Sequence, residues 1–146
     1  MNLGFYVESN GGTPQNTQIF NFLNSGLSSG GISDGSVFFN NVNFCPITPK
    51  FGMYNSTELW SFTGRLITTS IQNTKRAMAT VNKFKLAYLF SAGDDVRQGL
   101  FQLCDLSQKV PVITTCEEDR KEFYRLTGIK SNFVEELSVK AIKGVY

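Results

Sequence analysis

Short apolar runs alternate along the chain with stretches in which apolar residues recur every three or four positions. An apolar run is typical of a strand buried on both faces, and the longer spacing is typical of an amphipathic helix. Strands are predicted near residues 3–7, 36–40, 65–69, 85–90 and 110–115. Their alternation with helices predicts a doubly wound α/β domain, a three-layer sandwich in which helices cover both faces of a mainly parallel, five-stranded sheet.

Capping residues and glycines set the expected helix boundaries. Thr13 and Pro14 suit a helix start and Gly26 suits a helix end, so the first helix is expected from about residue 14 to 25. Later helices are expected from Asn55 to about 62, from Ser70 to about 81, from about 96 to 107, from Glu117 to Gly128 and from Asn132 to about 141.

An irregular, aromatic-rich insertion is expected at about residues 41–56. A short edge strand at 51–54 is an alternative for part of it. Pro46 and Pro49 break regular structure there. Large aromatic side chains in or beside a segment with few regular elements suggest a contact between copies of the chain or a ligand wall. The alternative is a loop folded over its own core. A homo-oligomer is accordingly predicted through Phe44, Phe51, Tyr54 and Trp60.

The loop after the first strand is the strongest candidate site. Asn10, Gly11 and Gly12 can take positive φ, and the helix that follows presents free N–H groups that favour an anion. With strand order 2-1-3-4-5, this loop lies beside the turn after the third strand. A tight turn without a ligand is the alternative. The predicted ligand-binding residues are Ser9, Asn10, Gly11, Gly12, Thr13, Thr69, Ser70 and Gln72.

Acidic residues follow three of the predicted strands and are further candidates for the crevice. These residues are Glu8, the pair Asp94 and Asp95, and Glu117 with its neighbours Glu118 and Asp119. Paired carboxylates can hold Mg²⁺ or act as acid and base, but at helix starts they also interact favourably with the helix dipole, which is the preferred interpretation. Glu8 can accept from ligand hydroxyls. Since Ser9 follows it, the acidic pair that a receiver domain uses is missing.

Two resemblances arise at these residues. Residues 9–17 (SNGGTPQNT) resemble the phosphate loop of flavodoxins, from which they depart in length and by Pro14. Residues 66–73 (LITTSIQN) and 112–119 (VITTCEED) are similar to strand-to-helix turns in the Rossmann-like halves of GT-B glycosyltransferases. These resemblances imply a Rossmann-like or flavodoxin-like fold. A GT-B enzyme has two such halves around its site, and this chain has room for one.

Composition narrows the choice of chemistry. The 146 residues, 41% hydrophobic and 18% charged, suit one globular domain over residues 1–146. A net charge of +2 gives no strong nucleic-acid signal. No signal peptide or transmembrane segment is apparent, so a soluble, cytoplasmic protein without membrane contact is expected.

The reactive residue types point away from several common mechanisms. The chain has no histidine, which excludes Ser–His and Cys–His nucleophiles within one chain and removes the commonest transition-metal ligand. Cys45, Cys104 and Cys116 are widely spaced, so neither a disulfide framework nor a zinc site is suggested, and no metal is expected.

The function favoured by these observations is binding of a small anionic ligand, phosphate-containing and of nucleotide or sugar-nucleotide type, at the carboxyl edge of the sheet. The alternatives are a non-catalytic oligomeric interaction protein and a single-half glycosyltransferase-like or flavin-binding protein. Whether the chain is an enzyme, and with which cofactor, stays open.

Overall fold

The computed structural model describes residues 1–80, 82, 84–91 and 99–146. The strands are β1 (Asn2–Ser9), β2 (Asp34–Asn41), β3 (Gly52–Asn55), β4 (Gly64–Thr68), β5 (Phe84–Leu89), β6 (Val112–Thr114) and β7 (Asn132–Phe133). The helices are α1 (Pro14–Ser29), the 3-10 helix η1 (Ser56–Ser61), α2 (Ile71–Ala79), α4 (Leu100–Ser107), α5 (Glu117–Thr127) and α6 (Val139–Val145).

Within these residues the strands form one sheet in the order β3-β2-β1-β4-β5-β6-β7, and all its neighbouring strands are parallel. The α/β class and the parallel sheet are confirmed, and the five predicted strands have the order 2-1-3-4-5. The predicted number of strands is wrong, because a short strand is added at each edge. β3 corresponds to the edge strand at 51–54 that the sequence offered as an alternative, and β7 was not predicted.

β7 replaces the predicted start of the last helix. Asn132 pairs with Ile113 of β6, and Val134 N donates to Thr114 O at 2.9 Å. The exposed edge of β6 offers backbone groups that need partners, and this segment supplies them. The helix start moves to Ser138, whose hydroxyl accepts from Ala141 N at 3.1 Å.

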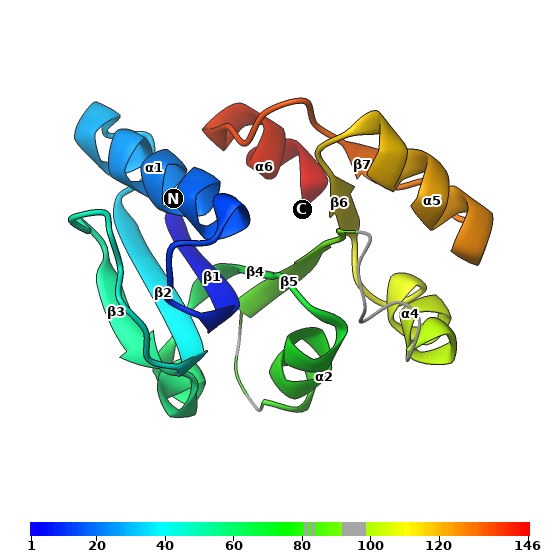
Figure 1. The fold of residues 1–146 in the computed structure, drawn as a ribbon, viewed down its shortest axis with the longest axis horizontal. Coiled ribbons are helices and arrows are strands. Elements are labelled where there is room, and N and C mark those ends of the chain that lie inside the picture. Colours follow the sequence, from blue (N-terminus) through cyan, green and yellow to red (C-terminus); the bar gives the residue numbers. More distant parts are fainter. Residues whose placement is uncertain (81, 83, 92–98) are drawn as a thin grey trace.

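Helices cover both faces of the sheet (Figure 1). α1 and α6 lie on one side, and α2 and α4 lie on the other. The core divides in the same way, since alternate residues of a strand point to opposite faces. Ala87 and Leu89 of β5 belong to the cluster under α1, whereas Tyr88 joins Leu103 of α4 and Phe123 of α5.

A sheet covered on both faces predicts that Leu86 and Leu89 of β5 and Val112 and Ile113 of β6 are nearly inaccessible to solvent. Leu89, Val112 and Ile113 are buried, at 4%, 3% and 0% exposure. Leu86 is only partly buried and packs at the margin of two clusters. The expectation of near-complete burial is therefore wrong for Leu86.

The first helix continues four residues beyond its expected end. Gly30, with φ of 80°, caps α1 in the left-handed region. Gly26 instead lies inside the helix against Ile32, where an added Cβ would clash with Ile32 Cδ1. Gly26 therefore permits close packing and does not end the helix.

Candidate functional site

The loop between β1 and α1 is held by its own side chains. The Thr13 hydroxyl accepts from Asn16 N at 3.1 Å, and Ser9 Oγ accepts from Gly11 N at 3.2 Å. Asn16 is buried, and its Nδ2 donates to Ser9 O at 2.6 Å and to Gly11 O at 2.9 Å. The two hydroxyls predicted to contact a ligand thus accept hydrogen bonds from the backbone of the loop and helix.

The two glycines of the loop lie against the aromatic-rich insertion. A Cβ on Gly11 would lie 3.2 Å from Asn43 Nδ2, and one on Gly12 would lie 3.0 Å from Pro46 Cγ. Asn10 is buried, and its Oδ1 accepts from Asn43 N at 2.5 Å. Neither glycine has a positive φ, so the loop does not use the left-handed conformation that the glycines would permit. The glycines allow the side chains of Asn43 and Pro46, from the insertion folded over the loop, to come close.

The turn after β4 lies beside β1, where the strand order placed it. Thr69 donates to Tyr6 O through both N and Oγ1, at 3.2 and 3.1 Å. Ser70 Oγ caps α2 by accepting from Asn73 N at 3.1 Å, and Gln72 is exposed in the first turn. The structure brings the two predicted loops to adjacent strands, and Thr69 and Ser70 bond within the fold.

Glu8 joins the carboxyl ends of β1 and β2. Its carboxylate accepts from Asn40 Nδ2 at 2.8 Å and from Asn41 Nδ2 at 3.0 Å. Asn40 also donates to Asn73 Oδ1 at 3.0 Å and accepts from Tyr6 OH at 2.7 Å. The predicted contact of Glu8 with ligand hydroxyls stays a prediction, because this carboxylate already receives two donors from its own chain.

A hollow of about 150 Å³ opens at the carboxyl edge of the sheet, on the side of α1. Its walls are the first turns of α1, the end of β5, the β6–α5 turn and Leu137. Ile19 and Leu89 give it an apolar part. Its polar lining comes from Gln15, Gln18, Ser91, Thr115 and Asp119.

Two helix N-termini meet at this hollow and differ in charge. The first turn of α1 has no acidic residue, so no side-chain charge there offsets the positive end of the helix dipole. The first turn of α5 carries Glu117, Glu118 and Asp119, which is the dipole arrangement preferred from the sequence. Glu117 also lies 3.5 Å from the Arg120 guanidinium. The other acidic candidates, Asp94 and Asp95, lie outside the described residues.

Cys116 begins α5 and is not an activated nucleophile. Its Sγ accepts from Asp119 N at 3.4 Å. This hydrogen bond lowers the pKa of the thiol, but desolvation and the Asp119 carboxylate together raise it above its ordinary value. The thiol is therefore protonated at neutral pH, and the described residues give it a capping role.

The hollow is lined largely by residues that the sequence analysis did not select. Gln15, Gln18 and Ile19 follow the predicted helix start, and their spacing puts them on one side of α1. Thr115 is the last residue of a predicted strand. The helix face and the strand end could both have been identified from the sequence as parts of a site. The glycines of the preceding loop were selected instead.

The aromatic residues of the insertion separate into buried and exposed ones. Phe51 is buried, with its ring 5.3 Å from that of Phe20, so it is unavailable to a partner. Tyr54 is half exposed and lies 5.7 Å from Phe38. Phe44 and Trp60 are 80% and 66% exposed.

Comparison of the chain with protein-family models, curated proteins and solved structures found no match. Among the described residues no cluster of acidic or cysteine side chains is arranged to hold a metal ion. No helix in that part of the chain is long and apolar enough to cross a membrane.

Proposed function

We propose that this chain binds a small phosphate-containing ligand, of nucleotide or sugar-nucleotide type, at the carboxyl edge of its sheet. The observation that carries the proposal is the hollow between the first turns of α1 and α5. In parallel α/β sheets, ligands bind outside the carboxyl ends of the strands, and helix N-termini favour anions.

The size and lining of the hollow indicate which part of the ligand enters it. About 150 Å³ suits a phosphoryl group or part of a sugar, with the rest of the ligand outside. The uncharged first turn of α1, with Gln15 and Gln18, suits the phosphate. Asp119, on the opposite wall, suits a ligand hydroxyl, since a carboxylate repels phosphate.

A pair of charge variants tests the location. Gln18→Glu adds a negative charge at the hollow, whereas Gln72→Glu adds the same charge at the first turn of α2, beside the turn predicted from the sequence. We expect inorganic phosphate, a nucleotide, a sugar nucleotide or flavin mononucleotide to raise the melting temperature of the parent. Gln18→Glu should reduce that shift, and Gln72→Glu should leave it unchanged.

The opposite pattern, with only Gln72→Glu weakening binding, would return the site to the β1 and β4 loops. No shift with any ligand, at millimolar concentration and low salt, would contradict anion binding at either place. A response to flavin alone would favour the flavin-binding alternative, and a response to sugar nucleotide alone would favour glycosyltransferase-like chemistry.

We further propose self-association through Phe44 and Trp60, because both rings are largely exposed within this chain. Sedimentation velocity should show mass rising with protein concentration. Phe44→Ser with Trp60→Ser should abolish the rise, while exposed Tyr124→Ser should not. A parent that stays monomeric at high concentration would contradict this proposal.

A further inference from the structure

Beyond the proposed carboxyl-edge site, a second hollow of about 530 Å³ lies between α5 and the segment leading into β7. Its lining combines cations with aromatic rings, and among the described residues no acidic side chain contributes to it. The lining residues are Arg120, Lys121, Tyr124, Lys130, Ser131 and Phe133.

The positive charge of this hollow is only partly neutralised by the protein. Arg120 lies 3.5 Å from Glu117, in a pair about half exposed to solvent. Lys121 and Lys130 are exposed, and neither has an ion-pair partner in the part of the chain that the structure describes. An anionic partner would supply the missing charge.

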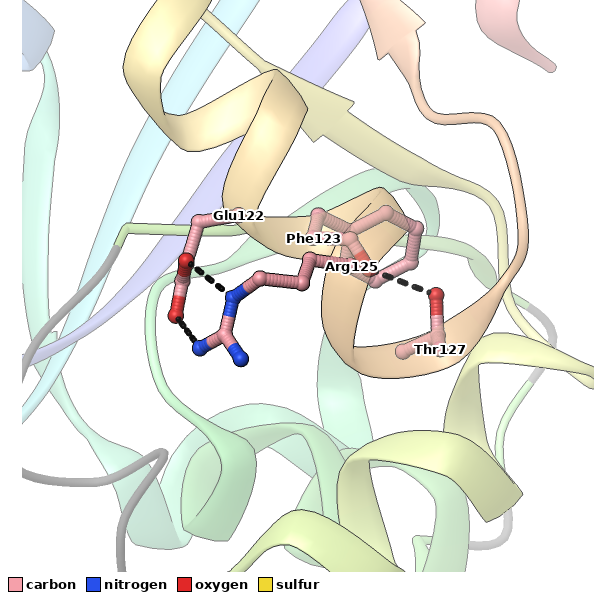
Figure 2. Close-up of polar contacts among 4 residues, drawn as sticks. All are labelled: Glu122, Phe123, Arg125 and Thr127. Atoms are coloured by element: carbon pink, nitrogen blue, oxygen red, sulfur yellow. Dashed lines mark hydrogen bonds and ion pairs between the residues drawn. The ribbon is translucent and has the colours of Figure 1, made fainter.

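The carboxylate of Glu122, next to Lys121 on α5, is already paired within the protein. Glu122 and Arg125 form a two-point ion pair, with bonds of 2.6 and 3.0 Å (Figure 2). The hydrogen bond from Arg125 lowers the pKa of Glu122, so this carboxylate is charged and paired at neutral pH. It is engaged with Arg125, which leaves Lys121 and Lys130 available to a partner.

The aromatic rings indicate the class of partner. The Arg120 guanidinium lies 5.5 Å from the centre of the Phe133 ring, and Tyr124 is 54% exposed. Flat rings and a stacked guanidinium beside lysines suit bases that stack while their phosphates meet the cations. An acidic peptide would use the lysines but leave the Tyr124 ring without a role.

We propose that this hollow binds single-stranded nucleic acid, with phosphates at Lys121 and Lys130 and a base on Tyr124. The sequence did not show it, because the cations come from two segments and the net charge is only +2. The fold brings them together, since β7 returns beside α5.

The test uses a fluorescent single-stranded oligothymidylate of about ten nucleotides, within the site sizes of such proteins, and anisotropy at several salt concentrations. Lys121→Gln with Lys130→Gln should weaken binding and reduce the slope of log affinity against log salt by about 1.4, at about 0.7 per phosphate contact. Tyr124→Leu should weaken binding roughly fivefold to hundredfold through lost stacking.

Lys140→Gln with Lys143→Gln on α6 is the matched control, since it removes the same charge from another surface. It should leave affinity within about twofold of the parent, as should Gln18→Glu at the other hollow. Unchanged melting temperatures would show that all variants fold. A parent that does not bind the oligonucleotide, or a control that weakens binding as much as the lysine pair, would overturn the proposal. So would equal affinity for polyglutamate or for a free nucleoside monophosphate.

Discussion

Single polar side chains fix the local conformation at several points where the sequence alone suggested a ligand. Asn16 is the clearest case, because one buried carboxamide supplies donors to two loop carbonyls. An unpaired buried carbonyl costs about 1–3 kcal/mol, so a residue three positions into a helix determines the shape of the preceding loop. Spacing in the sequence identified the helix cap but not this hydrogen bond, which depends on the turn that the folded chain takes.

Tyr146 allows a prediction about alkaline pH. Its hydroxyl donates to Leu66 O at 2.9 Å, and burial raises its pKa well above the ordinary value, although the Arg65 charge lowers it slightly. The unfolded chain releases this proton above about pH 10, while the folded chain retains it. Stability is therefore fully present below about pH 10 and falls as pH rises further, by up to about 1.4 kcal/mol per pH unit.

Tyr146→Phe should cost about 0.5–1.5 kcal/mol at pH 7 and should lose less stability above pH 10 than the parent does. Urea unfolding from pH 7 to 11 measures both effects. Tyr124→Phe, which alters an exposed ring, is the control and should follow the parent at every pH. Parallel curves for parent and Tyr146→Phe would show that this hydroxyl does not titrate differently on unfolding.

At the scale of elements, periodicity located the strands well and their ends less well. The runs that became β1, β2, β4, β5 and β6 are apolar because both faces of the sheet are covered. β7 has two residues, too few to show any period, and forms only because β6 offers it an open edge. The predicted end of the first helix at Gly26 was wrong, because the sequence does not distinguish a glycine that permits close packing from a glycine that ends a helix.

A substitution at Gly26 separates those two roles. Gly26→Ala should destabilise the protein by about 1 kcal/mol or more, because overpacking against buried Ile32 exceeds the usual helix gain of about 0.5–1 kcal/mol. Gly144→Ala in α6 is the control: nothing lies within 4 Å of its Cβ position, so it should stabilise by up to about 1 kcal/mol. Chemical denaturation measures both changes, and a stabilising Gly26→Ala would mean that Ile32 moves aside at little cost.

For the whole molecule, the sequence predicted that a site would lie at the carboxyl edge of the sheet. The strand order 2-1-3-4-5 was a condition of that argument, and the structure meets it. The position of the hollow along the edge could not be predicted from the sequence. The insertion folds over Gly11 and Gly12, while Gln15 and Gln18 line a hollow with Thr115. Thr115 directly follows β6, which lies two strands beyond β4 in the sheet, counted from β1. The approach of α1 to the β6–α5 turn depends on the twist of the sheet and on the packing of α5. The local spacing of residues in the sequence predicts neither.

The two-sided core gives the last prediction. Leu89 is 4% exposed and contributes to the cluster under α1 from a strand with neighbours on both sides. Leu89→Ala should therefore cost about 2–5 kcal/mol, because the cavity cannot collapse without moving the sheet or the helix. Met53→Ala on edge strand β3 removes a partly buried side chain of similar size and should cost less, since solvent can reach the gap that it leaves. At roughly 2–4 °C per kcal/mol, calorimetry should show a clearly larger fall in Tm for Leu89→Ala. Equal falls for the two variants would mean that the edge strand is as firmly packed as the centre of the sheet.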